Sequence, residues 1–231
     1  MFSPVPAPWR SAAADTKNGN EPQKAQKRVL FCAFCFFIVP FVYFPRFMRI
    51  ISGKFKSRRL KGTPPAGVRP TSDKLRETLF NVVGARVQGA IFLDGCAGAG
   101  AIGIEAVSRG AEFVYFVEQS RKACQFIREN LKALGIQEGF QIMEMDLIRA
   151  LNDIDTRFDI AFVDPPYDRE DLYERVLDTF GRTPHTAPGG VLILEHSKRT
   201  TLPEASGKLA KIRSLVQGDA ALAFYSSLEE A

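Results

Sequence analysis

The stretch Phe158-Asp159-Ile160-Ala161-Phe162-Val163-Asp164-Pro165-Pro166-Tyr167 decides the fold of this chain. Residues 158–163 are almost continuously apolar and rich in β-formers, which is typical of a central parallel strand covered on both faces. Pro165 and Pro166 end this strand, because a proline lacks a backbone N–H and has a fixed φ. The pattern therefore predicts that Asp164 lies at the carboxyl end of a buried strand, where open α/β sheets bind ligands.

The turn after this strand places a carboxylate next to an aromatic ring. A planar base could stack on Tyr167, while the Asp164 side chain and the Pro165 carbonyl accept hydrogen bonds from an exocyclic amine. Two such acceptors would orient the lone pair of the nitrogen toward an electrophile. Proline and aspartate are also common in ordinary turns. The position directly after a core strand nevertheless favours a catalytic role for Asp164, Pro165 and Tyr167.

The composition predicts one sizeable folded domain with extensions. The chain has 231 residues, of which 45% are hydrophobic and 25% are charged, as in ordinary globular proteins. Its net charge of +5 permits an anionic partner without requiring one. Cys32 and Cys35 form a lone C-x-x-C motif with no second pair and no nearby histidine, so we expect no metal site. Cys96 and Cys124 suit buried thiols of a cytoplasmic protein.

Strands and helices alternate along the remainder of the chain. The expected strands are 90–94, 113–118, 140–145, 158–164 and 191–195. The expected helices are 101–109, 120–134 and 170–180, preceded by one from Thr71 or Ser72 to about Val83 and followed by a terminal hairpin at 209–216 and 221–226. This order predicts βαβ units and a largely parallel sheet.

A glycine-rich turn follows the first expected strand. The sequence from Leu93 to Gly103 is LDGCAGAGAIG, in which Gly98, Gly100 and Gly103 let the backbone approach a ligand at the start of a helix. This turn alone also fits a dinucleotide-binding fingerprint. Glu118 ends the next strand, where a carboxylate could bind the ribose hydroxyls of either cofactor.

Asp94 favours S-adenosylmethionine over a dinucleotide, and Asp146 adds a possible contact with adenine. Asp94 lies four residues before Gly98; a carboxylate there would repel a pyrophosphate but suits the cationic amino-acid part of S-adenosylmethionine. Asp146 follows the third expected strand and could accept a hydrogen bond from the adenine amine. Together with the turn at Asp164, these carboxylates predict a class I methyltransferase.

The N-terminal region has two parts of different character. Residues 1–28 lack hydrophobic periodicity, and residues 29–45 form an uncharged, phenylalanine-rich run that is broken by Pro40. This run could be a membrane span or a targeting signal. We favour a third interpretation, in which residues 1–47 are an extension outside the fold and the natural start is Met48.

From Met48 the sequence predicts a small basic β-hairpin: a strand, a turn at Gly53 and a second strand. Basic residues recur through this segment, and no acidic residue lies between Met48 and Lys61. Lysines often protect the edge of a sheet, so the hairpin could simply be a solubilising edge. We favour contacts with the phosphate backbone of a nucleic acid.

Several of these motifs resemble the RsmD family, the bacterial small-subunit rRNA guanine-N2 methyltransferases. The resemblance covers about residues 48–225 and rests on the segments 48–54, 69–71, 76–81, 93–100 and 162–167. It implies a Rossmann-like class I methyltransferase fold, with a seven-stranded, mostly parallel sheet and a small N-terminal β-hairpin. It also implies methyl transfer from S-adenosylmethionine to the N2 amine of a guanine in 16S rRNA, within the small ribosomal subunit or its assembly intermediate.

The resemblance completes the set of expected site residues and domains. The expected cofactor-binding residues are Asp94, Ala97, Gly98, Gly100, Glu118 and Asp146. The expected RNA-binding residues are Arg49, Lys54, Lys56, Arg58, Arg59 and Arg69. The expected parts of the chain are the extension 1–47, the basic hairpin and loop 48–70, and the methyltransferase domain 71–231.

Two alternative functions remain open at this point. The same turn serves amino-methyltransferases generally, so an adenine-N6 DNA methyltransferase is one alternative, although no separate base-recognition domain is visible. A non-catalytic RNA-binding assembly factor is the other. The chain keeps Asp94, Glu118 and Asp164, which argues against a protein that has lost its catalytic activity.

Removal of residues 1–47 should leave a folded and active protein, because the change in composition at Met48 places those residues outside the fold. We expect residues 48–231 to match the full chain in melting temperature and in methyl transfer from labelled S-adenosylmethionine. An insoluble or inactive truncated protein would show that the extension is part of the fold.

Overall fold

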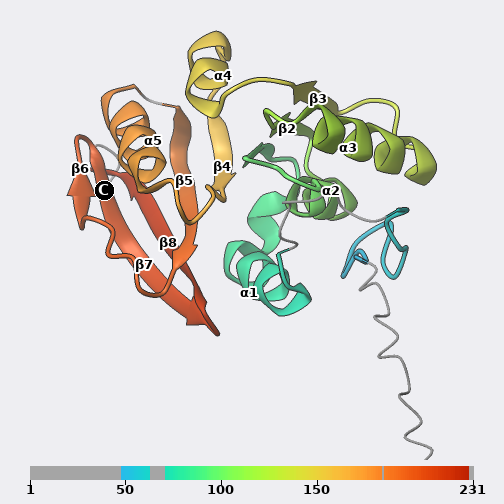
Figure 1. Cartoon of the computed structure of the whole chain (residues 1–231), viewed down its shortest axis with the longest axis horizontal. Coiled ribbons are helices and arrows are strands. Elements are labelled where there is room, and N and C mark those ends of the chain that lie inside the picture. Colours follow the sequence, from blue (N-terminus) through green and yellow to red (C-terminus); the bar gives the residue numbers. More distant parts are fainter. Residues whose placement is uncertain (1–47, 63–70, 184, 229–231) are drawn as a thin grey trace, which may run out of the picture. The chain divides into compact units, whose positions relative to one another are not determined.

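The computed structural model describes residues 48–62, 71–183 and 185–228 (Figure 1). The predictions made for residues 1–47 and for Arg69 lie outside these ranges. Within them, the helices are too short or too polar for any one to cross a membrane.

One mixed sheet forms the centre of the molecule (Figure 1). Its strands are β1 (Ile91–Gly95), β2 (Phe113–Val117), β3 (Phe140–Met143), β4 (Phe158–Val163), β5 (Thr186–Ser197), β6 (Ala205–Ser206), β7 (Leu209–Gln217) and β8 (Ala220–Ser227). Their order is β3-β2-β1-β4-β5-β8-β7-β6. The neighbours from β3 to β5 are parallel, whereas β8 is antiparallel to both β5 and β7. The sheet is therefore mostly parallel on one side of β5 and antiparallel on the other.

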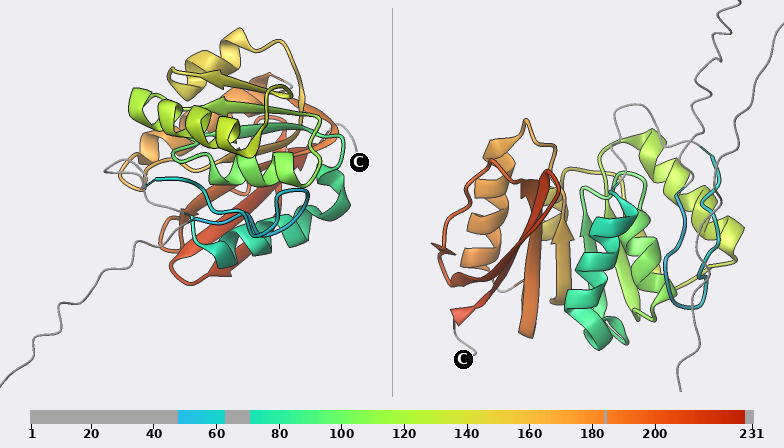
Figure 2. Two further views of the ribbon diagram at one scale, coloured as in Figure 1. Left: turned by 90° about the vertical axis from the view of Figure 1, so that its right-hand side faces the viewer. Right: turned by 90° about the horizontal axis from the view of Figure 1, so that it is seen from below.

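Helices cover both faces of this sheet (Figure 2). They are α1 (Asp73–Val83), α2 (Ala101–Ser108), α3 (Arg121–Leu134), α4 (Leu147–Asp153) and α5 (Glu170–Arg182). Alternate residues of β4 point to opposite faces: Ile160 belongs to the core beneath α1, α2 and α3, and Ala161 to the core beneath α4 and α5. The continuous apolar run of β4 is explained by this burial on both sides.

The predicted order of the main strands and helices is confirmed, with a few differences in extent. The sheet has eight strands rather than seven, because the two-residue strand β6 pairs with β7 at the edge. The sequence prediction also missed α4 and a 3-10 helix at Gly84–Val87. These elements have between two and seven residues, too few to show a clear periodicity.

The predicted N-terminal hairpin is not seen as a pair of strands. The described residues 48–62 contain a single antiparallel bridge between Arg49 and Arg59. Three more backbone hydrogen bonds join the limbs: from Ile50 N–H to the Arg58 carbonyl (2.9 Å), from Ser57 N–H to the Ile50 carbonyl (2.8 Å) and from Leu60 N–H to the Met48 carbonyl (2.8 Å). The two limbs of the basic segment are therefore hydrogen-bonded to each other, but they do not form a regular pair of strands.

A buried carboxylate of α2 attaches this segment to the rest of the fold. Glu105 is fully buried. Its two carboxylate oxygens accept the backbone N–H groups of Ile51 (2.7 Å) and Ser52 (2.9 Å) and the Nε–H of Arg109 (2.8 Å). Hydrogen bonds of this kind offset the cost of burying the charge.

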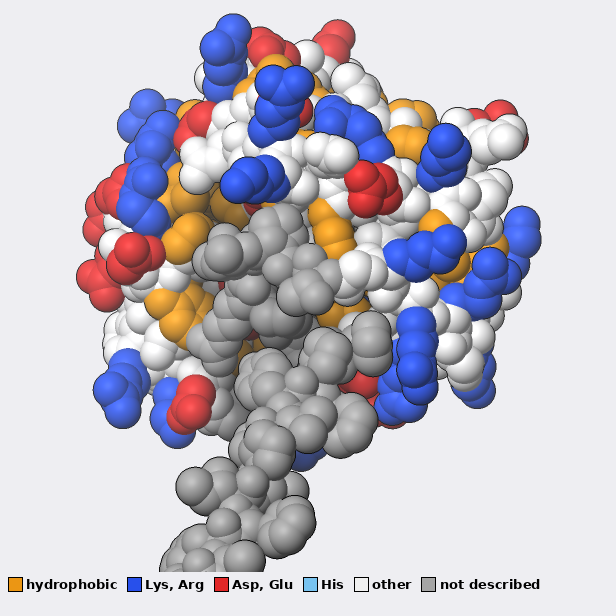
Figure 3. Space-filling model, turned by 45° about the vertical axis from the view of Figure 1, so that its right-hand side comes forward, with side chains coloured by type: hydrophobic (Ala, Val, Ile, Leu, Met, Phe, Trp, Pro, Cys, Tyr) orange, Lys and Arg blue, Asp and Glu red, His pale blue; other side chains and the backbone are white. Residues whose placement is uncertain are grey.

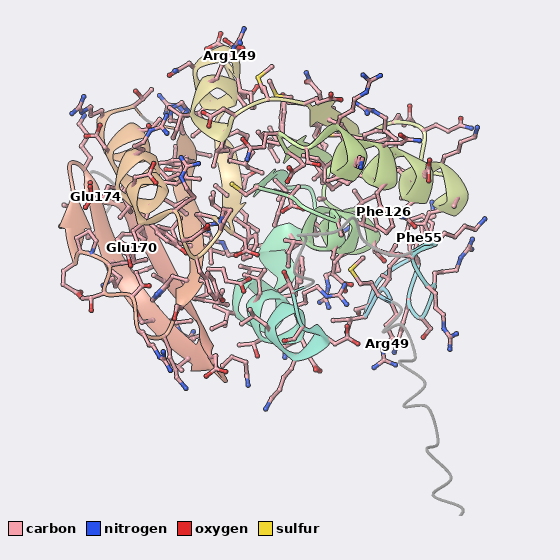
Figure 4. The ribbon with its side chains drawn as sticks, viewed as in Figure 1. Arg49, Phe55, Phe126, Arg149, Glu170 and Glu174 are labelled. Atoms are coloured by element: carbon pink, nitrogen blue, oxygen red, sulfur yellow. The ribbon has the colours of Figure 1, made fainter. Side chains whose placement is uncertain are left out.

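Further contacts fix the turn and the end of the segment. Ser108 Oγ accepts the Phe55 N–H (3.0 Å), and Gly53 lies so close to α2 that a Cβ there would be 1.8 Å from the Ser108 carbonyl oxygen. Asn130 of α3 accepts the Lys61 N–H (2.6 Å). Phe55 packs against the core that includes Phe126 of α3 (Figure 4). Since all these partners lie far away in the sequence, local patterns could not reveal them.

The close approach of α2 to β2 gives a test of this packing. A Cβ at Gly103 would lie 2.2 Å from the buried ring of Phe116, so Gly103→Ala should cost about 1–3 kcal/mol of unfolding free energy through overpacking. Phe116→Leu makes room, so the double variant should be more stable than the sum of the two single changes predicts. Urea unfolding of the four proteins measures this coupling. Additive effects, or an undisturbed Gly103→Ala variant, would contradict the packing.

Candidate active site

A pocket of about 740 Å³ opens at the carboxyl ends of the parallel strands. Its volume is typical of sites that hold a cofactor-sized ligand. Eight of the predicted site residues line it: Asp94, Ala97, Gly98, Glu118, Asp146, Asp164, Pro165 and Tyr167. The topology thus brings the glycine-rich turn, the strand-end carboxylates and the Asp-Pro-Pro-Tyr turn to one place.

Two glycines of the first turn have structural roles instead. Gly100 does not line the pocket; it has a left-handed φ of +70° at the start of α2, and a Cβ there would be 2.8 Å from Ile127. Gly103 packs against Phe116, as described above. Gly98, with a φ of +53°, is the glycine whose backbone faces the pocket.

Asp94 is a buried carboxyl group in the wall of the pocket. It lies on β1, is 1% exposed and accepts a 2.8 Å hydrogen bond from the N–H of Gly103. Burial raises the pKa of Asp94 to about 8, and the charge of Glu118 contributes in the same direction, whereas the bond from Gly103 lowers it. Near neutral pH the free protein therefore holds a proton here, and a bound cation would favour its release.

Glu118 stabilises the glycine-rich turn through hydrogen bonds to the backbone. It follows β2, and its carboxylate accepts the N–H of Gly98 (2.9 Å) through one oxygen and the N–H of Ser120 (2.7 Å) through the other. A carboxylate has about four lone-pair sites, so it can accept ligand hydroxyls in addition. The side chain predicted to bind ribose therefore also fixes the backbone that would approach the ligand.

Asp146 is the N-cap of α4. Its Oδ1 accepts the N–H groups of Ile148 (3.0 Å) and Arg149 (3.3 Å). Among the described residues, the other oxygen, Oδ2, takes no hydrogen bond from the protein. The cap thus orients the side chain while one oxygen remains for a ligand donor.

The Asp-Pro-Pro-Tyr turn is fixed at both ends. The N–H of Asp164 donates to the Gly95 carbonyl (3.1 Å), and the N–H of Arg169 donates to the Pro166 carbonyl (2.9 Å). The Tyr167 hydroxyl donates to Oε1 of Glu195 over 3.4 Å. The aromatic ring and the carboxylate predicted to act on an amine therefore share a rigid turn.

Sequence reasoning missed Glu195, although it predicted a strand ending at this residue. Glu195 is 5% exposed and lines the pocket. A charged residue near the end of an otherwise apolar strand was the available signal.

Four acidic side chains surround Cys96 in the pocket. Burial raises the pKa of the Cys96 thiol above its ordinary range, and the charges of four surrounding carboxylates raise it further. These four are Glu118, Asp164, Asp94 and Asp146. Such a pocket suits a ligand that carries positive charge and disfavours a pyrophosphate.

Five of the predicted RNA-binding residues fall in the described part of the chain, and none of these five lines the pocket: Arg49, Lys54, Lys56, Arg58 and Arg59. Arg49 forms an ion pair with Asp73 at the start of α1 (3.0 Å). Lys54 N–H donates to Ser108 at the opposite end of α2 from the glycine-rich turn, and eight residues of helix span about 12 Å. On the face shown in Figure 3, lysine and arginine side chains are spread around the margin with acidic side chains between them. The basic segment thus runs from the neighbourhood of the pocket to a point well away from it.

Comparison with known proteins assigns the family. The family model described as Conserved hypothetical protein 95 matches residues 48–226. YlbH of Bacillus subtilis, provisionally named an rRNA methyltransferase, is 37% identical over 181 residues, covering 77% of this chain and 98% of YlbH. Ribosomal RNA small subunit methyltransferase D (RsmD) of Escherichia coli K12 is 32% identical over 178 residues, covering 77% of this chain and 89% of RsmD.

Solved structures share the fold. The Escherichia coli protein yhhF superposes with a TM-score of 0.69 at 29% identity, covering 78% of this chain and 97% of yhhF. The 16S rRNA N2 methyltransferase RsmC of T. thermophilus, in complex with AdoMet and guanosine, superposes with a TM-score of 0.57 at 24% identity, covering 70% of this chain and 44% of RsmC. The mostly parallel α/β sheet is thus that of methyltransferases, and the chain belongs to the RsmD/YlbH family, whose named members include rRNA methyltransferases.

Proposed function

We propose that this protein transfers a methyl group from S-adenosylmethionine to the exocyclic N2 amine of a guanine in 16S rRNA. The observation that carries the proposal is the shared pocket, in which the Asp164–Tyr167 turn faces the strand-end carboxylates and the glycine-rich turn. Family membership supports rRNA as the substrate class, since the relatives RsmD and YlbH are named for it.

The residues of the pocket fit S-adenosylmethionine, which supplies an electrophilic methyl group on a sulfonium. Its positive charges suit the four carboxylates that surround Cys96. We assign Asp94 to the amino-acid ammonium, Glu118 to the ribose hydroxyls and Asp146 to the adenine amine. The backbone at Ala97 and Gly98 would pass close to the amino-acid part. That RsmC was solved with AdoMet supports this choice of cofactor for the fold.

The chemistry assigned to the turn is positioning. The carboxylate of Asp164 and the carbonyl of Pro165 accept the two N–H groups of the amine, which directs the nitrogen lone pair into the cofactor side of the pocket. A guanine amine is hardly basic, so orientation matters more than prior removal of a proton. When the new C–N bond forms, the nitrogen becomes positively charged and must lose a proton. The Asp164 carboxylate is placed to accept that proton.

The target base must leave its stack to reach Tyr167, which favours an RNA loop or bulge. Contacts with phosphates would then come from the basic segment 48–62, because the pocket itself repels them. Arg49 and Arg59, which form the bridge near Met48 in the pocket wall, would lie closer to the target nucleotide. Lys54 and Lys56 would meet a more distant part of the RNA.

Changes at the turn should separate chemistry from binding. Asp164→Ala should lower the single-turnover rate with little change in cofactor affinity, since this side chain acts on the amine as it attacks. Tyr167→Ala loses stacking worth about 1–3 kcal/mol, or about 5- to 150-fold, whereas Tyr167→Phe keeps the ring and should be far less affected. Rapid-quench methyl transfer and calorimetry measure the two quantities. Parental rates in Asp164→Ala would remove Asp164 from the reaction.

Cofactor binding should release a proton from Asp94. The pKa of this carboxyl is about 8 in the free protein, above its unfolded value, so it is protonated at pH 7. A cationic ligand beside it favours the ionised form, so affinity should rise as pH increases from about 6.5 to about 8.5. Calorimetry in buffers of different ionisation enthalpy counts the protons: the parent should approach one per cofactor, and Asp94→Asn should release none from this site. Equal proton release in both proteins would show that Asp94 does not face the cation.

A further inference from the structure

Glu195 is a carboxylate of the pocket for which the reaction described above has no role. It lies on β5, beside the strand that carries the catalytic turn. Val163 of β4 pairs with Leu194 of β5 in parallel register, so the next residues, Asp164 and Glu195, reach the same edge at the same level. Both line the pocket. Two carboxylates from neighbouring strands thus face one ligand site.

The surroundings of Glu195 fix its position. Its side chain is almost fully buried, and Oε1 accepts the Tyr167 hydroxyl over 3.4 Å. Tyr173 of α5 is buried, and burial raises the pKa of its hydroxyl. The nearby charges of Asp164 and Glu195 raise this pKa further. A carboxylate offers about four lone-pair sites, and the hydrogen bond from Tyr167 uses one of them. Glu195 can therefore accept a further donor from a base stacked on Tyr167.

Guanine and adenine differ at the atom next to the amine. In guanine the ring N1 carries a hydrogen, so N1–H and the N2 amine are adjacent donors on one edge. In adenine the ring N1 beside the N6 amine is an acceptor. With the amine held at Asp164 and Pro165, a guanine would present N1–H to a neighbouring acceptor, whereas an adenine would present a lone pair to a negative charge.

We infer that Glu195 accepts the N1–H of the target base and is the residue that selects guanine over adenine; this inference rests on the proposed function. Asp164 accepts a hydrogen bond from the amine, and Glu195 accepts one from the adjacent ring N1–H. A ligand without a donor at this position binds poorly. It would remove water from the Glu195 carboxylate and offer no hydrogen bond in return.

A simpler role for Glu195 would be to hold the Tyr167 ring through its hydroxyl. The two roles predict different results. If Glu195 acts only through Tyr167, then Tyr167→Phe, which removes that hydroxyl, should change base preference as much as a change of Glu195. If Glu195 reads the base, Tyr167→Phe should keep the preference for guanine.

The experiment uses two synthetic RNAs that differ at one base. The guanine that the parent protein methylates is mapped first, and a second RNA then carries 2-aminopurine there. 2-Aminopurine keeps the reacting amine but has no hydrogen on N1. Single-turnover methyl transfer with saturating labelled S-adenosylmethionine is measured for both RNAs. We expect the parent to prefer guanine by at least about 100-fold.

Glu195→Gln should lower the rate on guanine by about 10- to 150-fold, because a charge-assisted hydrogen bond is lost. Its amide can donate to the bare N1 of 2-aminopurine, so the preference for guanine should fall toward one. Glu174→Gln is the matched control, since Glu174 is an exposed carboxylate of α5 (Figure 4) and should leave the preference unchanged. Cofactor affinity, measured by calorimetry, checks that each variant is folded.

The outcomes separate the inference from the proposed function. A parent protein that methylates no guanine overturns the proposed function and the inference with it. A parent that methylates guanine but accepts 2-aminopurine equally well overturns the inference alone, and this comparison needs no variant. A parental preference in Glu195→Gln, or an equal loss of preference in Tyr167→Phe, overturns it as well.

Discussion

The common carboxyl edge of β1, β4 and β5 is the constraint on which the site depends. Gly95 pairs with Val163, and Val163 pairs with Leu194, so β1 and β4 end at the level of Leu194, beyond which β5 continues to Ser197 beside β8. The prolines after Asp164 stop β4 there and make the following turn stiff. Burial of β4 on both faces holds this edge in place, because a shift in register would move apolar side chains of two cores.

The proposed function gives different roles to the acidic pocket and the basic segment. The pocket gathers four carboxylates around Cys96, which suits a cationic cofactor and repels phosphate. The lysine and arginine side chains of the basic segment 48–62 do not line the pocket, and in the proposed function they meet the RNA backbone. Only an unstacked base would then enter the acidic pocket, while its phosphates remain outside. The buried Glu105 contributes to this division by holding the basic segment on α2.

Local patterns predicted most of the sheet because strand periodicity and strand-end carboxylates are local features, as at Asp94, Glu118 and Asp164. The pair of strands predicted for residues 48–62 is not seen, and this segment is attached to the fold by long-range contacts from Glu105, Ser108 and Asn130. The seven residues of α4 were also too few to detect, and Asp146 was read as a ligand-binding group without its capping role. Glu195 was missed for a related reason. It lies beside Asp164 only because β4 and β5 pair in the folded sheet.

The central claim is that the turn after β4 presents a guanine amine to S-adenosylmethionine, and the methylated product tests it most directly. Purified protein is incubated with labelled S-adenosylmethionine and, separately, small-subunit particles, naked small-subunit RNA and duplex DNA. The nucleosides of each are then separated after digestion. The account predicts label in N2-methylguanosine from the ribosomal substrates. Label in N6-methyladenine from the DNA, or no transfer to any substrate by a protein that binds the cofactor, would contradict it.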